Sequence, residues 1–138
     1  MGRWEIYLHL VWATKHREAL LTLTKEEIAY RAIRAIVEAE GYEVLDINGM
    51  PDHIHLLIKA KTKLDITYLM QRVKGSVSAL LTDIAKQDEQ LRWQEGYFAA
   101  SVTPSQVPKI RAYIQNQKQH HSEQTTHSFW ENTGTDET

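Results

Sequence analysis

The sequence predicts an α+β protein with a ferredoxin-like (RRM-like) βαββαβ sandwich, in which an antiparallel sheet carries two helices on one face. Three observations support this fold class. Strand-like and helix-like segments follow each other in the split βαβ order, the 138 residues are enough for one domain with a core, and 42% of them are hydrophobic. A further helix follows the last strand, outside the two-layer sandwich, and is available to carry functional groups.

The first half of the chain contains the segments expected to form three strands and one helix. Residues 4–13 (WEIYLHLVWA) alternate in hydrophobicity and are rich in aromatic and β-branched types, which predicts a strand. Thr24, with Glu27 three residues later, forms a capping-box signature, so we expect a helix to begin there and to end at Gly41. Two more strands and the turn between them are expected at residues 42–48, 53–60 and 49–52.

The second half predicts a long helix, a short strand and a last helix. Asp65 can cap the long helix, which fades into the polar residues 86–90. Its apolar residues recur at helical spacing: Ile66, Leu69, Val73, Val77, Leu80 and Ile84. Residues 97–103 predict the fourth strand, and Ser105 can cap a last helix over residues 107–121.

Charge by itself does not indicate a nucleic-acid partner. The formal net charge is −2, from 16 Lys and Arg against 18 Asp and Glu. Residues 122–138 hold four acidic residues and no Lys or Arg, so the rest of the chain is mildly basic. We therefore divide the chain into a single domain at residues 1–121 and a polar, acidic C-terminal tail at residues 122–138, with Phe129 and Trp130 as candidate anchors of that tail.

Other features of the composition exclude several classes of protein. The chain has no cysteine, which excludes a disulfide framework and a thiolate metal site. It has no run of about 18 apolar residues, and its first residues lack the layout of a signal peptide. We expect a cytoplasmic protein with no membrane association.

Two histidines in the predicted third strand are candidate metal ligands. Side chains alternate along a strand, so His53 and His55 share one face while Ile54 points to the other. Two imidazoles about 7 Å apart along a strand can close on one divalent ion. A histidine pair of this kind is also common as an ordinary feature of an open sheet face, so the pair alone does not decide between the two interpretations.

The last predicted helix carries a second pair of functional side chains. Tyr113 and Gln117 are four residues apart and therefore project from the same helix face. A tyrosine hydroxyl becomes a nucleophile only beside a cation or a base. The amide oxygen of Gln117 can complete a metal site with two nitrogen ligands and one oxygen ligand, which suits Mg²⁺ or Mn²⁺ and leaves positions for phosphate oxygens. An ordinary surface helix is the alternative for these two residues taken alone.

The two pairs together are more informative, because a metal polarises a phosphate and a tyrosine can attack it. Four blocks of the chain, in this order, resemble the single-tyrosine transposases of the insertion-sequence 200/605 type, members of the His-hydrophobic-His (HUH) superfamily. The blocks are residues 9–17 (HLVWATKHR), 49–57 (GMPDHIHLL), 96–102 (GYFAASV) and 113–121 (YIQNQKQHH). The resemblance covers roughly residues 4–130.

The resemblance implies a role for each of these side chains. His53 and His55 match the paired metal ligands, Gln117 matches the third ligand, and Tyr113 matches the catalytic nucleophile. The implied reaction is cleavage of single-stranded DNA through a 5′-phosphotyrosine intermediate, with release of a 3′-hydroxyl that later rejoins DNA. The implied partners are DNA hairpins at the element ends and a second copy of the chain, whose tyrosine helix can complete the histidine site in trans. The implied location is the cytoplasm of a prokaryote.

Several other residues are weaker candidates. Spaced basic residues can contact the DNA backbone or simply form a solvated face: Lys15, Arg17, Lys59, Lys61, Lys63, Arg72 and Lys74. Asp52 can hydrogen-bond a ligand imidazole or cap a turn. His120 and His121 are expected at the end of the last helix rather than as ligands, and the face occupied by His9 is left open.

Two alternative functions accompany the active transposase. The chain can be a domesticated relative similar to the repeat-associated tyrosine transposases, which would keep the same catalytic residues. It can also be a non-catalytic, ferredoxin-like module that binds metal or DNA, an interpretation that the low positive charge favours and the spacing of Tyr113 and Gln117 disfavours.

Overall fold

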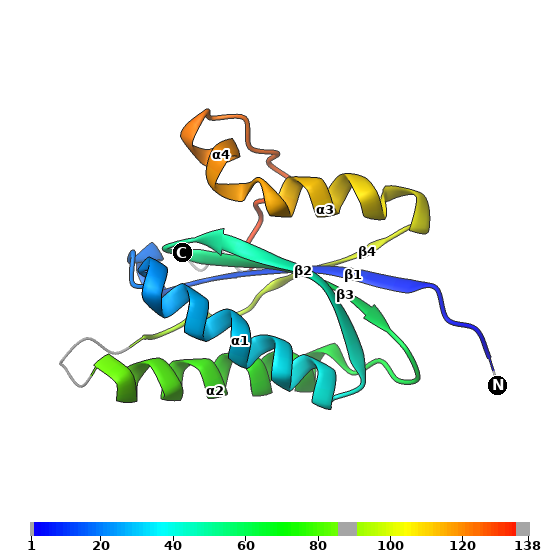
Figure 1. The fold of residues 1–138 in the computed structure, drawn as a ribbon, viewed down its shortest axis with the longest axis horizontal. Helices are drawn as coiled ribbons and strands as arrows, with labels where there is room; N and C mark the ends of the chain where they lie inside the picture. The colour runs from blue at the N-terminus through cyan, green and yellow to red at the C-terminus, as the bar shows by residue number, and fades with distance from the viewer. Residues whose placement is uncertain (1, 86–90, 135–138) are drawn as a thin grey trace.

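The computed structural model in Figure 1 describes residues 2–85 and 91–134 and confirms the ferredoxin-like α+β class. Four strands form one antiparallel sheet in the order β2–β3–β1–β4. The elements are β1 (Ile6–Ala13), α1 (Leu23–Ala39), β2 (Tyr42–Met50), β3 (His53–Ala60), α2 (Ile66–Ala85), β4 (Phe98–Val102), α3 (Val107–Gln115) and α4 (Gln117–Ser122). Helices α1 and α2 cover one face of the sheet, while α3 and α4 lie over the other (Figure 1).

The main core lies between the sheet and the helices α1 and α2. Alternate side chains of β3 enter it, namely Ile54, Leu56 and Ile58, all fully buried. They pack with apolar residues of both helices, such as Ile33 and Val73, as a period of two along a strand requires. Among the aromatic residues, Trp12 belongs to this core, and Trp93 and Tyr97 pack against it. The alternation therefore directs the intervening residues of β3 to the opposite face.

That opposite face is covered by the helix that follows the last strand. Leu57 of β3 and Val102 of β4 form a second buried cluster with Ile110 and Ile114 of α3. Trp130, one of the two candidate anchors, packs against the same cluster. Burial of these side chains holds α3 across the face on which the histidines lie, at roughly 25 cal/mol for each Å² of apolar surface removed from water.

The two predicted helix starts before α1 and α3 are wrong by short distances. Thr22, not Thr24, caps α1, because Thr22 has an extended backbone directly after the buried Leu21, and the Lys25 amide donates to the Thr22 hydroxyl at 3.4 Å. Ser105 does not cap α3, because it lies inside a 3-10 turn, Pro104–Gln106, that leads directly into the helix. The Asp65 cap of α2 is confirmed by a hydrogen bond from the Tyr68 amide at 3.1 Å.

Three further predictions differ from the structure in detail. The last helix is not continuous but breaks at Asn116 into α3 and α4. Leu80 is exposed, since Leu81 takes the buried position on α2. The turn before β3 shortens to Pro51–Asp52, because β2 extends to Met50. The side chain of Ile84 and residues 86–90 lie outside the described part of the chain. Among the helices that the structure describes, none has the length and hydropathy to cross a bilayer.

Candidate functional site

His53 and His55 open strand β3 and point towards α3, as the alternation of the strand predicts. In the register of the sheet they lie opposite Ala13 and Val11 of β1. Both imidazoles are almost completely inaccessible to solvent, with exposed fractions of 1% and 0%. Their ring centroids are 5.1 Å apart. Two buried imidazoles at this spacing need hydrogen-bond partners or a shared ligand, because an unpaired buried polar group is costly.

Each of the two rings is oriented by a hydrogen bond at its Nδ1 atom. Asp52 Oδ1 lies 2.7 Å from His53 Nδ1, which answers the question that the sequence left open for Asp52. His9 of β1 lies on the same face, and its Nε2 atom is 3.0 Å from Nδ1 of His55. With both Nδ1 atoms engaged, both Nε2 atoms are directed to one point, which is the arrangement that metal-binding histidines require.

Polar contacts with β2 fix the position of the helix that carries Tyr113. Arg111 forms an ion pair with Asp46 at 2.6 Å. The Asn48 side-chain amide donates to the carbonyl oxygens of Ile114 and Gln115 at 3.0 and 3.2 Å, where the helix ends. These bonds satisfy carbonyl groups that the helix end would leave unpaired. The helix is therefore held to the sheet at the level of the histidines.

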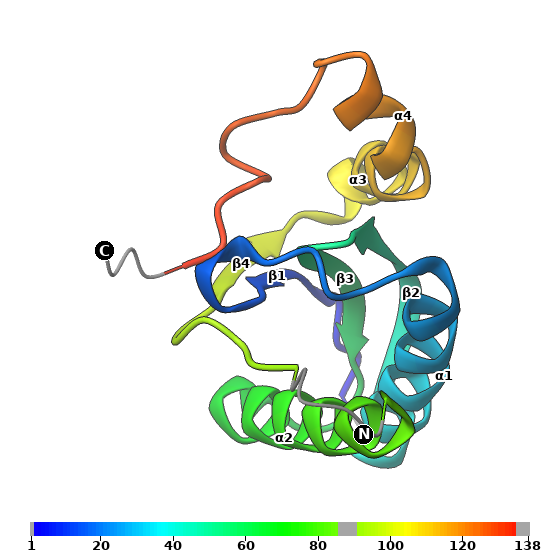
Figure 2. The same ribbon diagram turned by 90° about the vertical axis from the view of Figure 1, so that its left-hand side faces the viewer.

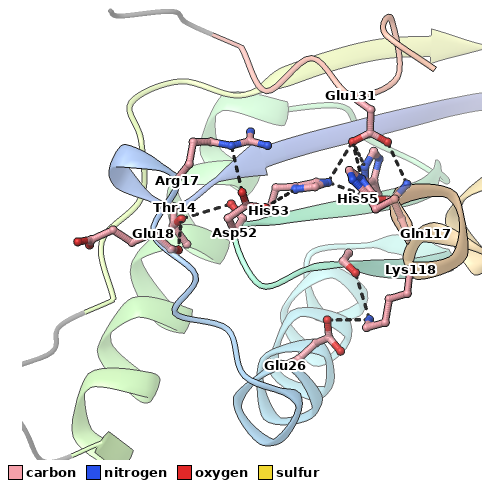
Figure 3. A network of polar contacts seen from close by, with 12 residues as sticks. Thr14, Arg17, Glu18, Glu26, Asp52, His53, His55, Gln117, Lys118 and Glu131 are labelled. Carbon is pink, nitrogen blue, oxygen red and sulfur yellow. Dashed lines mark hydrogen bonds and ion pairs between the residues drawn. The ribbon is translucent and has the colours of Figure 1, made fainter. Parts of the chain in front are cut away.

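The break at Asn116 still leaves Tyr113 and Gln117 facing the same centre. Gln117 is fully buried, and its Oε1 atom lies 3.1 Å from Nε2 of His53. The next residue, Lys118, donates to Glu26 of α1 at 3.0 Å and to the carbonyl oxygen of Gly49 at 3.1 Å (Figure 3). Lys118 thus ties the start of α4 to the main sandwich.

A carboxylate that the sequence did not predict lies at the middle of the site. The segment after α4 runs back to the sheet (Figure 2), and Glu131 projects from it between the two histidines (Figure 3). Glu131 Oε1 lies 3.0 Å from Nε2 of His53 and 3.3 Å from Nε2 of His55. Glu131 Oε2 accepts hydrogen bonds from Nε2 of Gln117, at 3.0 Å, and from the hydroxyl of Tyr113. The segment predicted as a polar tail therefore contributes a central group of the site.

Two histidines of the last block take positions that the sequence did not predict. His121 joins the centre, with its Nε2 atom 3.0 Å from Gln117 Oε1 and 3.2 Å from Glu131 Oε1. His120 instead stacks on Tyr113, with ring centroids 4.6 Å apart. The prediction that both merely end the helix is therefore incomplete for His121.

Burial and charge shift the protonation of the cluster. Burial raises the pKa of Glu131, but hydrogen bonds from His53 and His55 outweigh it and hold that pKa well below its usual range. Burial lowers the pKa of His53, but its bonds to Asp52 and Glu131 raise it above the ordinary imidazole value. Burial lowers the pKa of His55 below that value. Burial and the adjacent carboxylate both raise the pKa of Tyr113, so its hydroxyl is neutral in this state.

The donor atoms fit a divalent metal ion. The nitrogen atoms of His53 and His55 and a carboxylate oxygen of Glu131 lie within 4.8 Å of one another. Two ligands about 2.1 Å from an ion and at right angles to each other are themselves about 3 Å apart. The distances from His53 Nε2 to Gln117 Oε1 and to Glu131 Oε1, 3.1 and 3.0 Å, match that spacing. Two imidazole nitrogens with two oxygens make a mixed donor set that several divalent ions accept.

Several of the basic residues singled out as DNA contacts have partners within the chain. Two of them, Lys63 and Arg72, form ion pairs with Glu40 beyond the far end of β3. Lys59 lies near Glu5 at 3.8 Å. Lys74 is half-buried and donates to the carbonyl oxygens of Gln94 and Gly96, both at 2.9 Å, a structural role.

The segment around Lys15 and Arg17 lies at the histidine end of the sheet. Arg17 forms an ion pair with Asp52 at 3.3 Å. Lys15 is exposed in the short 3-10 turn between β1 and α1, whereas Lys61 is exposed after β3.

Sequence reasoning missed Glu131 and His9 for different reasons. A single carboxylate in an aperiodic segment carries no signal of its own, although the adjacent Trp130 did indicate that this stretch packs. His9 does carry a signal, because β1 and β3 pair residue by residue and His9 lies opposite Leu57, two residues beyond His55. Once that register is known, His9 shares the face of the metal ligands.

Comparison with known proteins agrees with the fold and identifies a family. A family model described as "Transposase IS200 like" matches residues 3–117. The ISDra2 transposase TnpA of Deinococcus radiodurans is 28% identical over 124 residues, which are 84% of this chain and 89% of that protein. The transposase for insertion sequence element IS200 of Salmonella typhimurium is 27% identical over 120 residues, 83% of this chain and 78% of that protein.

Two solved structures share the architecture. One is a protein of Deinococcus radiodurans R1 described as a transposase, with a TM-score of 0.66 and 27% identity; the match covers 85% of this chain and 95% of that one. The other is a REP-associated tyrosine transposase bound to a REP hairpin, with a TM-score of 0.67 and 14% identity over 88% of this chain and 72% of that one, a likeness of fold. Because the family model spans residues 3–117, from the start of the sandwich through the tyrosine-bearing helix α3 to the first residue of α4, this chain belongs to the IS200-like transposase family.

Proposed function

We propose that this chain is an active transposase that cleaves and rejoins single-stranded DNA at hairpin-containing element ends through a 5′-phosphotyrosine intermediate. Tyr113 is the nucleophile, and His53, His55 and Gln117 hold a divalent metal ion, Mg²⁺ or Mn²⁺. Glu131 is a further oxygen donor to that ion. Membership of the IS200-like transposase family supports the general part of this proposal, a role in DNA transposition.

One observation supports this chemistry above all others. The hydroxyl of Tyr113 and the Nε2 atoms of His53 and His55 contact the same carboxylate, Glu131, within one chain. A nucleophile and a metal-binding pair that meet at one group are close enough to act on one phosphodiester. A module that only bound metal would have no need for a tyrosine hydroxyl at this point.

The residues of the chain prepare the attack by orienting the tyrosine. Its hydroxyl donates to Glu131 and accepts a hydrogen bond from the backbone amide of His127 at 2.9 Å, so the oxygen is held in one direction. In the reaction Tyr113 Oη loses its proton and forms a bond to phosphorus, the bond from phosphorus to the 3′-oxygen breaks, and that oxygen takes up a proton, so that no net proton is gained or lost. The reverse attack by a 3′-hydroxyl rejoins DNA without an external energy source.

The raised pKa of Tyr113 explains why the reaction needs a cation. Burial and the Glu131 carboxylate both oppose ionisation of the hydroxyl. A divalent ion bound beside His53 and His55 supplies positive charge that favours the ionised tyrosine and polarises the phosphate. Without such an ion we expect no cleavage.

A covalent-adduct assay tests the proposal. The protein is incubated with single-stranded oligonucleotides that carry hairpins, with Mg²⁺ or Mn²⁺, and the adduct is detected by denaturing electrophoresis. We expect an adduct that Tyr113→Phe abolishes and a chelator prevents. Tyr68→Phe is the matched control, because Tyr68 is exposed on α2 and lies on the other side of the sheet. An adduct that survives in Tyr113→Phe would exclude this tyrosine as the nucleophile.

We further propose that the chain forms a homodimer. An experiment with mixed variants tests whether the tyrosine of one chain completes the active site of the other. Tyr113→Phe and His53→Ala are each expected to be inactive. If the tyrosine of one chain serves the histidines of the other, mixing the two variants restores part of the activity. If mixing restores nothing, each site works with the tyrosine of its own chain.

A further inference from the structure

A cavity of about 470 Å³ adjoins Tyr113, between α3 and α4 on one side and the segment after α4 on the other. None of the metal-donor side chains lines it, so it is separate from the metal centre while sharing the nucleophile. Its volume falls within the range of sites that bind small molecules.

Aromatic rings form its walls. His127 stacks on Trp130, with ring centroids 4.1 Å apart and an interplanar angle of 21°. Tyr113 lies edge-on to Trp130, with centroids 4.9 Å apart, and stacks on His120. Trp130 is itself anchored in the second apolar cluster, so this wall has a fixed position. Stacked aromatic rings of this kind bind the flat faces of nucleobases, whichever base is present.

The charge of the cavity suits a nucleotide. No acidic residue is among the residues that line it. Lys109 lies at its edge, with its ammonium group 6.0 Å from the centre of the Trp130 ring. None of the ion pairs found in residues 2–85 and 91–134 occupies Lys109, which leaves its charge available to a phosphate. A polar rim with Asn116 and Thr126 can meet the edges of a base.

We propose that this cavity binds an unpaired nucleobase of the single-stranded substrate, that of a nucleotide beside the phosphodiester that is cut. The proposal rests on the function proposed above. The hydroxyl at the tip of Tyr113 is the reacting group, and the ring of the same side chain forms a wall of the cavity. A nucleotide whose phosphate lies at the hydroxyl therefore has its base within reach of the cavity. Lys109 then contacts the neighbouring phosphate.

Nuclear magnetic resonance of the tryptophan side chains tests the proposal directly. The chain has four tryptophans and therefore four indole N–H signals, of which that of Trp130 is identified by its loss in Trp130→Leu. The probes are oligothymidylate and an abasic oligomer of equal length, added without metal. We expect oligothymidylate to shift the Trp130 signal and the abasic oligomer to leave it unchanged.

Variants separate stacking from a change of fold. His127→Ala removes an exposed ring and keeps the backbone amide that contacts Tyr113, and it is expected to weaken oligothymidylate binding by roughly five-fold or more. Phe129→Leu is the matched control, because Phe129 is a neighbouring aromatic residue, 56% exposed, that does not line the cavity. It is expected to bind as the unmodified chain does.

Each outcome has a defined meaning. An equal shift with the abasic oligomer would show that the site binds only the DNA backbone, and the absence of any shift would show that no base enters; either result overturns the proposal. A DNA adduct without a Trp130 shift would refute the base site and leave the transposase chemistry in place. A Trp130 shift without any adduct would support the base site and refute the proposed cleavage.

Discussion

Replacing His9 with phenylalanine removes one hydrogen bond from the proposed metal site while keeping an aromatic ring in a buried position. His9 is almost fully buried, and its Nε2 atom is the partner of Nδ1 of His55. When Nε2 of His55 binds a metal, its proton must lie on Nδ1, and His9 is the acceptor of that proton. Burial, together with repulsion from His55, lowers the pKa of His9 to about 3, so its ring is neutral and can accept.

The expected magnitude follows from the alternatives open to His55. In the metal-free variant the proton can move to Nε2, where Glu131 Oε1 lies 3.3 Å away and can accept it. Metal binding removes that option and leaves a buried N–H without a partner, at about 1–3 kcal/mol. At about 1.4 kcal/mol for each factor of ten, metal affinity is expected to fall roughly five- to 150-fold.

The assay measures Mn²⁺ affinity by electron paramagnetic resonance and, separately, thermal unfolding of the metal-free protein. Stability is expected to remain the same or to rise, since His9 Nδ1 is one of two buried side-chain atoms in the described part of the chain without a hydrogen-bond partner. Tyr7→Phe, on the same strand and the same face, serves as the control and is expected to bind Mn²⁺ normally. A dissociation constant for His9→Phe within two-fold of the original would refute the orienting role of His9.

Two other predictions concern stability. A Cβ atom on Gly49 would lie 2.2 Å from the backbone oxygen of His53, so Gly49→Ala should lower the free energy of unfolding, measured by urea titration, by about 1–3 kcal/mol. Gly75 lies in open space on α2, so Gly75→Ala should raise the free energy of unfolding by about 0.5–1 kcal/mol. An equal effect of the two substitutions would contradict the packing argument. In metal-free protein the carboxylate of Glu131, with its depressed pKa, contributes stability above pH 4.5, and its partner His53, with a raised pKa, contributes it below pH 6.5. Glu131→Gln should therefore cost most between those values and progressively less as the pH rises through the pKa of His53 in the folded protein, whereas a cost independent of pH would rule out the ion pair.

The sequence predicted those parts of the molecule that depend on local periodicity. The alternation of residues 53–60 placed both histidines on one face of the sheet. The spacing of Tyr113 and Gln117 placed these two residues on one face of the last helix. The structure agrees on both points. Helical spacing does not reveal the break at Asn116, because the side-chain positions three and four residues apart survive it. There the Asn116 side chain donates to the carbonyl oxygen of Ala112 at 2.9 Å and satisfies a group at the end of the helix.

Periodic spacing of residues does not predict contacts between segments that are distant in the sequence. Glu131 reaches the site only because Trp130 packs under α3, a tertiary contact that no local pattern contains. The partners of two DNA-contact candidates could not be predicted for a related reason. Lys63 and Arg72 are paired by Glu40, which precedes them by more than twenty residues and reaches them through the packing of α1 beside α2.

The pairing of β3 with β1 has a consequence for how members of such a lineage can change in length. The ladder runs without interruption from Ala13 and His53 to Ile6 and Ala60. An insertion or deletion of one residue within β3 would exchange its two faces, burying the imidazoles among aliphatic residues and presenting Ile54 to the nucleophile. Strand β2 already accommodates an irregularity between Val44 and Asp46. Natural length variation is thus expected to accumulate in β2 and the surface loops, while β3 is inherited at constant length.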